Sequence, residues 1–132
     1  MKEIVYRIQD EYGRGPFRPG FSKQWHDQYF DVGMKPLPTW GDEFGWDLID
    51  RKGRAGEFFG TAVRRPEKLC EWFSATERGR LELLGFAAVS MPINRVLAES
   101  ENQLVFARKV ALHRYIVAIP MPKPPQTVQV MK

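Results

Sequence analysis

Two glutamates one residue apart, Glu99 and Glu101, precede the apolar run Leu104-Val105-Phe106 in the last third of the chain. Carboxylates are poor strand formers, so a simple hairpin has no structural need for them there. A carboxylate at the start of a buried strand holds a negative charge rigidly at the edge of a cleft, where it can stabilise positive charge that develops in a reaction. We therefore expect Glu101 to begin this strand and to be the main candidate for catalysis.

A second candidate group lies at the other end of the chain. Glu3 to Ile8 is a short run of β-branched and aromatic residues that predicts a strand, and it carries Tyr6 and Arg7. An arginine side chain offers a planar fork of N–H donors that pairs with a phosphate at two points, which a lysine cannot do. A further predicted strand at 56–63 offers two aromatic rings and a hydroxyl group, on Phe58, Phe59 and Thr61.

Turn residues and apolar spacing predict short elements around these groups. Further strands are expected at 86–91, where Pro92 ends the strand, at the run that begins with Leu104-Val105-Phe106, and at 113–119. Short helices are expected after four start signals. A Ser22 cap predicts a helix through Trp25 and Tyr29, and a Thr39 cap predicts one with Trp40, Phe44 and Leu48 on one face. Pro66 predicts a helix through Phe73, and the capping box Ser74-Ala75-Thr76-Glu77 predicts a helix that ends at Gly85. Because strands and helices are segregated, the predicted class is α+β, with one domain at 1–119 and an extended or disordered proline-rich tail at 120–132.

Composition restricts the function classes. The chain has 132 residues and a formal net charge of +4, which falls short of the dense basic patch expected of a dedicated nucleic-acid-binding protein. One cysteine, Cys70, excludes an internal disulfide, and with only two histidines we expect no metal site. The sequence shows no signal peptide and no apolar run long enough to span a membrane, so a cytoplasmic setting is expected.

The order of these groups resembles the ADP-ribosyltransferase superfamily over about residues 4–119. Val5-Tyr6-Arg7 is similar to the opening strand of that family, where an aromatic residue and an Arg or His are usual. Residues 56–62 and the following Pro66-Glu67-Lys68-Leu69 resemble its middle strand and the helix after it, although no Ser-Thr-Ser is present and Phe58 stands where Tyr is often found. Its closing strands are similar to Leu84-Gly85-Phe86, residues 101–106 and residues 115–117 of this chain.

The resemblance implies a fold with split antiparallel or mixed β-sheets, NAD as the substrate, and an unidentified protein or nucleic-acid acceptor. Glu101 would stabilise the positive charge that builds on the ribose as the bond to nicotinamide breaks, and Glu99 would orient the acceptor. Arg7, beside Tyr6, would pair with the pyrophosphate or a ribose. Phe58 or Phe59 would form a wall for the nicotinamide ring, next to Thr61.

The glycine- and proline-rich segment from Gly13 to Gly20 supports more than one interpretation. It directly follows the strand that carries Arg7, so it could fold over a nucleotide, with Arg14 or Arg18 contacting a phosphate. The same segment and its continuation interleave cations with aromatic residues and could form a nucleic-acid surface, on Arg14, Phe17, Arg18, Phe21, Lys23 and Trp25. Plain packing is equally consistent.

Three functions therefore stay open: an NAD-dependent mono-ADP-ribosyltransferase or NAD glycohydrolase, a binding or inhibitor module on the same fold without catalysis, and a small basic nucleic-acid-binding protein. Each candidate residue also has a purely structural explanation. Arg7 would serve in a surface ion pair, Phe58 and Phe59 would be core residues, and the two glutamates would flank a solvated turn.

Overall fold

The computed structural model describes residues 3–17, 21–27 and 37–124, and these form two three-stranded antiparallel sheets with short helices, which confirms the α+β class. The first sheet has the order β1–β3–β6, with β1 at Glu3–Gln9, β3 at Ala87–Ile93 and β6 at Val117–Ile119. The second has the order β2–β5–β4, with β2 at Phe58–Ala62, β5 at Leu104–Arg108 and β4 at Arg95–Glu99. The helical elements are η1 Ser22–Gln24, α1 Trp40–Phe44, α2 Leu48–Lys52, η2 Pro66–Lys68, α3 Leu69–Trp72 and α4 Ala75–Leu83.

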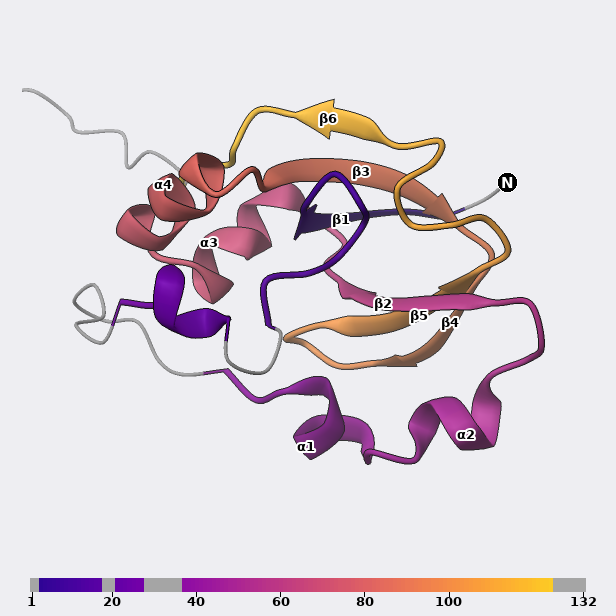
Figure 1. The fold of residues 1–132 in the computed structure, drawn as a ribbon. Coiled ribbons are helices and arrows are strands. Elements are labelled where there is room, and N and C mark those ends of the chain that lie inside the picture. Colours follow the sequence, from indigo (N-terminus) through magenta and orange to yellow (C-terminus); the bar gives the residue numbers. More distant parts are fainter. Residues whose placement is uncertain (1–2, 18–20, 28–36, 125–132) are drawn as a thin grey trace, which may run out of the picture.

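The two sheets meet where β1 runs beside β2 (Figure 1). A single antiparallel bridge joins them there, between Tyr6 and Val63, with both N···O distances at 2.9 Å. Because side chains alternate along a strand, Val5, Arg7 and Gln9 face one side of β1 while Tyr6 and Ile8 face the other. Val5 belongs to the apolar cluster shared by the two sheets, together with Ala62, Val89, Met91, Ile93, Leu104 and Phe106.

Two further apolar clusters attach the helices to the sheets. Ile8 and Ala88 of the first sheet pack with Leu69 of α3, with Phe73 directly after α3, and with Leu81 of α4. Val105 and Ala107 of the second sheet pack with Leu48 of α2, and α1 and α2 lie along that sheet (Figure 1). Each sheet therefore has one face toward its helices and one toward the shared cluster.

Local signals for helix ends are confirmed. The Ser74 hydroxyl accepts a hydrogen bond from the Glu77 amide at 3.1 Å, and the Glu77 carboxylate accepts one from the Ser74 amide at 2.9 Å, which completes the capping box. Gly85 follows α4 with a φ of +89°, a conformation that glycine adopts without strain. Thr39 caps α1 by accepting from the Asp42 amide at 3.2 Å.

Two helix predictions are wrong in extent. The helix expected from Trp40 to Leu48 ends at Phe44, and α2 begins separately at Leu48, yet all three apolar residues of the predicted face pack in one cluster. Ser22 makes no side-chain cap, because η1 has only three residues and Phe21 occupies the cap position. Tyr29 lies outside the described residues.

Three strand predictions are corrected by the sheet pairing. Pro92 does not end the strand but lies inside β3, opposite Ile4. A proline is tolerated there because β6 pairs only with residues 88–90, so no strand on that side needs an N–H donor from position 92. The strand expected at 113–119 shortens to β6, preceded by a loop. Glu99 ends β4, a strand that the sequence did not predict, and Glu101 lies in the turn before β5 rather than in the strand.

An ion pair between Glu57 and Arg95 joins the start of β2 to β4. Nε and Nη2 of Arg95 donate to the Glu57 carboxylate at 2.9 and 2.8 Å, and the Arg54 amide donates to it at 2.8 Å. The hydrogen bonds from Arg95 lower the pKa of Glu57 from 4.5 to about 2.

This lowered pKa predicts how stability depends on pH. A carboxylate with a depressed pKa in the folded state stabilises the fold above its unfolded pKa of 4.5 and loses that contribution as the pH falls toward about 2. Urea unfolding of the wild type and of Glu57→Gln should therefore show a difference in unfolding free energy that is constant near neutral pH and shrinks below pH 4.5. If the difference in unfolding free energy stays constant down to a pH of about 2, the ion pair between Glu57 and Arg95 does not stabilise the fold in this way.

Candidate functional site

The turn that carries Glu101 is fixed by its own hydrogen bonds and by two helices. Within the turn, the Ser100 amide donates to the Gln103 carbonyl at 2.9 Å, and the Ser100 hydroxyl accepts from the Asn102 amide at 3.0 Å. Outside it, Trp72 Nε1 of α3 donates to the Asn102 carbonyl at 3.0 Å. The Glu43 carboxylate of α1 accepts from the side chains of Asn102 and Gln103 at 2.9 and 3.0 Å. Glu101 therefore projects from a rigid turn although it is exposed.

A depression of about 230 Å³ lies beside this turn. Its lining combines the turn with the segment after β2: Val63, Arg64, Arg65, Lys68, Glu99, Ser100, Glu101, Asn102, Gln103 and Leu104. Lys68 also pairs with Glu71 at 3.0 Å. The depression thus brings the Glu101 carboxylate together with the cations of Arg65 and Lys68, a combination that suits a ligand with both anionic and cationic character.

Glu99 is held in an ion pair rather than presented to a ligand. Arg64 donates to its two oxygens through Nε at 2.5 Å and Nη2 at 2.8 Å, and donates to Glu3 through Nη1 at 3.1 Å. The hydrogen bonds with Arg64 lower the pKa of Glu99, and the same contacts raise that of Arg64. The explanation for Glu99 at the end of a strand is therefore this cross-link between β1, β4 and the segment after β2.

Arg7 lies between the two sheets with its guanidinium buried. Nη1 packs against Gly60 of β2, where the absence of a side chain leaves room, and the Phe106 ring centroid lies 5.8 Å from the guanidinium carbon. Within the described part of the chain, neither Nε nor Nη1 of Arg7 has a hydrogen-bond partner. Desolvation by burial lowers the pKa of Arg7 to about 10, although the nearby charge of Asp10 opposes this.

A second buried arginine lies on the same side of the second sheet. Arg108 of β5 is 2% exposed, and its Nη2 donates to the Arg114 carbonyl at 2.9 Å while Nη1 lies 3.6 Å from the sulfur of Met91. Burial lowers the pKa of Arg108. Two guanidinium groups are therefore buried between the sheets, and neither makes an ion pair within the described residues.

Comparison with known proteins identifies the family but not an activity. A family model described as "Bacteriophage T4 Y00F protein" matches residues 1–119. The chain belongs to this family. No curated protein and no solved structure matches it. In this family member, what the site can do must be judged from its own geometry.

The structure divides the residues predicted to bind the cofactor between different faces. Phe58, Gly60 and Ala62 alternate onto the face of β2 that Arg7 contacts, and Phe58 is exposed. Phe59 packs with the cluster around Leu48, so Phe59 and Thr61 face the opposite side. Tyr6 likewise faces away from Arg7 and lines a groove with Pro66 and Ile119. Of the two aromatic candidates, only Phe58 shares a face with Arg7.

Arg7 on β1 and Glu101 in the turn before β5 do not line the same depression, and β2 lies between the two strands. β1 adjoins β2 through the Tyr6–Val63 bridge, and β2 pairs with β5, which follows the Glu101 turn. Val63 and Leu104 line the depression, whereas the Arg7 side chain extends toward Gly60 and Phe106. The strands that the sequence predicted to carry the site therefore lie in adjoining sheets, but the side chains of Arg7 and Glu101 do not converge on one depression.

The loop after β1 forms a packed turn in its described part, 10–17. Asp10 Oδ1 accepts from the amides of Tyr12 and Arg14, both at 2.9 Å, and its Oδ2 accepts from Arg14 Nε at 2.8 Å. The Pro16 carbonyl accepts from Trp25 Nε1 at 3.1 Å. Arg14 is therefore held by Asp10, and Arg18 lies outside the described residues. These contacts favour a structural loop over the predicted nucleotide cover.

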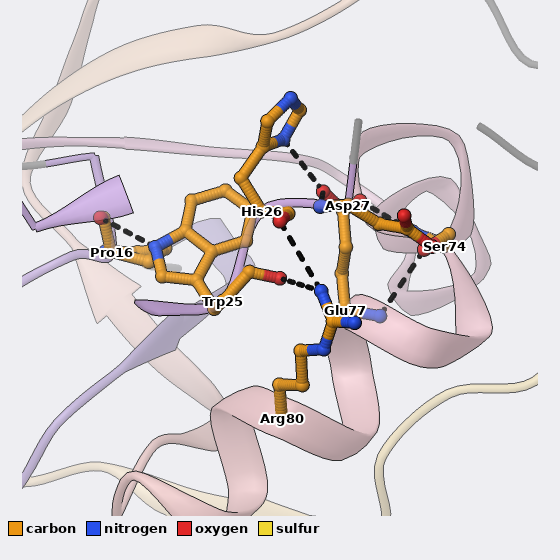
Figure 2. A network of polar contacts seen from close by, with 7 residues as sticks. All are labelled: Pro16, Trp25, His26, Asp27, Ser74, Glu77 and Arg80. Carbon is orange, nitrogen blue, oxygen red and sulfur yellow. Dashed lines mark hydrogen bonds and ion pairs between the residues drawn. The ribbon is translucent and has the colours of Figure 1, made fainter. Parts of the chain in front are cut away.

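A polar network joins the segment 22–27 to α4 (Figure 2). Glu77 is buried, and its carboxylate lies 2.8 Å from His26 Nδ1 and accepts from the Asp27 amide at 3.0 Å, in addition to its bond with Ser74. Arg80 donates to the carbonyls of Trp25 and His26 at 3.4 and 3.2 Å. Trp25 is only 1% exposed, so the nucleic-acid surface predicted around it has no accessible ring at this position.

Sequence reasoning missed the cations that surround Glu101. Arg64 and Arg65 lie between β2 and η2, and Lys68 ends η2. The sequence pattern that could have indicated these cations is a pair of basic residues between a predicted strand and the proline that starts a helix. Trp72, which anchors the turn, had no signal beyond its place on a short helix. None of the helices in the described ranges has the length and apolar character needed to cross a bilayer.

The fit between Arg7 and Gly60 gives a testable result. A Cβ on Gly60 would lie against Nη1 of Arg7 and 2.7 Å from Cζ of Phe106, so we expect Gly60→Ala to lower the unfolding free energy by about 1–3 kcal/mol through overpacking. Gly79 of α4 is the matched control, because no atom lies within 4 Å of its added Cβ. Gly79→Ala should stabilise the protein by about 0.5–1 kcal/mol, since alanine favours a helix interior. Urea unfolding of both variants measures this, and equal effects would contradict the close contact.

Proposed function

We propose that the chain is an NAD-dependent mono-ADP-ribosyltransferase, or an NAD glycohydrolase, with an ADP-ribosyltransferase-like fold. The observation that carries this proposal is Arg7: a buried guanidinium on the first strand, with two nitrogen atoms that lack a partner among the described residues. An unpaired buried charge is costly, and each such group calls for a missing partner. A phosphate or ribose oxygen of NAD would supply that partner.

The arrangement around Glu101 supports the same proposal. NAD carries negative charge on its diphosphate and gains positive charge on the ribose as the bond to nicotinamide breaks. Arg65 and Lys68 suit the first charge, and the Glu101 carboxylate on its rigid turn suits the second. The proton balance is simple for the hydrolytic form: the bond between the ribose carbon and nicotinamide breaks, water adds its oxygen to that carbon, and one proton is released.

Ligand-dependent stability is the direct test. With NAD at a hundred times its dissociation constant, we expect the unfolding free energy to rise by about 2.7 kcal/mol, which appears as a higher Tm. Nicotinamide release measured on the same sample then tests turnover. Adenosine without phosphates serves as the control ligand, and it should shift the Tm little because it lacks the anionic part. A Tm that NAD leaves unchanged would reject this proposal.

A second candidate is a binding module on the same scaffold without catalysis. The observation that favours it is the separation of Arg7 from the depression, together with the capture of Glu99 by Arg64, which removes the second carboxylate from any acceptor. Such a module would act through its surface, for example as an inhibitor of another protein, and would release no nicotinamide. The two measurements above therefore separate the candidates, because only the enzyme gives both a Tm shift and turnover.

A further inference from the structure

Two loops that are far apart in the sequence lie against each other beyond the end of β1. One is the turn 10–14, and the other is the connection 109–116 between β5 and β6. Gln9 Nε2 donates to the Leu112 carbonyl at 2.8 Å, and a Cβ on Gly13 would lie 2.8 Å from Cβ of Leu112. The second loop is also fixed to β5, because Nη2 of Arg108 donates a hydrogen bond to the Arg114 carbonyl. The two loops therefore form one supported surface.

Two tyrosines stand exposed on this surface. Tyr12 is 64% exposed and Tyr115 is 75% exposed, although both are large enough to stabilise the fold if they were buried. Tyr115 also has a φ of 56°, and within the described residues it is the one residue other than glycine with a positive φ. A tyrosine in this region is strained by about 1–3 kcal/mol, and such strain is retained mainly at functional positions.

Basic residues accompany the two rings on both loops. The guanidinium carbon of Arg14 lies 5.0 Å from the Tyr12 ring centroid, and Lys109, His113 and Arg114 are exposed on the second loop. Residues 109–115 contain no acidic side chain. On the first loop, Asp10 is engaged by Arg14, and Glu11 is the other carboxylate. We name Tyr12, Arg14, Lys109, His113, Arg114 and Tyr115 the tyrosine–arginine surface.

We propose that the tyrosine–arginine surface binds single-stranded nucleic acid. Proteins that bind single strands combine cations that follow the phosphates with aromatic rings on which unpaired bases stack, and both groups are present here. A duplex keeps its bases stacked on one another, so exposed rings favour the single strand. This surface shares Arg14 with the one predicted around Trp25 but uses other aromatic rings, and its binding requires neither NAD nor Glu101.

Fluorescence anisotropy with a labelled oligothymidylate of about 15 nucleotides, and with the corresponding duplex, tests the proposal on the full chain. At about 50 mM salt we expect the single strand to bind more tightly than the duplex. The double variant Tyr12→Ala/Tyr115→Ala should weaken binding by roughly 10-fold or more, because each stacked base is lost. The double variant Lys109→Gln/Arg114→Gln should weaken binding and reduce the dependence of log affinity on log salt by about 1 to 2.

Matched variants separate a direct role from an effect on folding. Trp46→Ala removes an aromatic ring that is also 64% exposed but belongs to the connection between α1 and α2, so affinity should stay at the wild-type value. Tyr115→Gly removes the ring and relieves the positive φ, so it should raise the Tm while lowering affinity. The proposal is overturned if the oligonucleotide does not bind at low salt, if the duplex binds as tightly, or if Trp46→Ala costs as much affinity as the tyrosine variants.

Discussion

Replacing Glu101 by Gln should leave the fold and NAD binding intact but lower the rate of nicotinamide release by about 100- to 1000-fold. The substitution removes the negative charge and keeps the size and most hydrogen-bonding capacity of the side chain. Glu101 is exposed, and its turn is held by the Ser100, Trp72 and Glu43 contacts rather than by its own carboxylate. Single-turnover nicotinamide release, with the Tm shift by NAD on the same variant, measures both parts of the expectation.

Glu82→Gln provides the control for this experiment. Glu82 is an exposed glutamate on α4 and does not line the depression, so its replacement should leave the rate unchanged. Glu99→Gln should lower the unfolding free energy instead, because it breaks the cross-link with Arg64. If Glu101→Gln releases nicotinamide at the wild-type rate, the carboxylate has no role in the reaction, whereas an unchanged Tm shift would still support nucleotide binding.

Replacing Arg7 by Met should have opposite effects on stability and on binding. Arg7 is buried without an ion pair among the described residues, and an unpaired buried charge carries a desolvation cost that an apolar side chain of similar volume avoids. We therefore expect a higher unfolding free energy for Arg7→Met and a loss of NAD affinity. Urea unfolding and calorimetric titration with NAD measure the two effects.

Arg7→Lys is the conservative comparison. It keeps a positive charge but loses the planar fork, so NAD should bind more weakly while the side chain stays cationic. A structural arginine would behave differently: both variants would lower the unfolding free energy and leave NAD affinity unchanged. That outcome would place Arg7 outside the ligand site and assign its contacts with Gly60 and Phe106 to packing alone.

Several elements could be predicted from the sequence because neighbouring residues determine them. The Ser74–Glu77 capping box, the end of α4 at Gly85 and the Thr39 cap all form between residues within a few positions of one another. The caps at Thr39 and Ser74 satisfy unpaired amides three positions further along each helix, and Gly85 supplies the positive φ that follows α4. The α+β class follows in the same way from the separate runs of strand and helix patterns.

Only the tertiary structure decided which candidate residues line the depression and which are buried between the sheets. Whether Pro92 interrupts β3 depends on how far β6 extends, and whether Glu99 can lie in a strand depends on Arg64, which is 35 positions away. Arg7 is buried because Gly60 leaves space for it on a different strand, and Phe59 and Thr61 leave the face of Arg7 through the pairing of β2 with β5. Tyr12 and Tyr115 share a surface because two distant loops touch. These properties arise from contacts between distant segments, and side-chain types alone do not specify which segments meet.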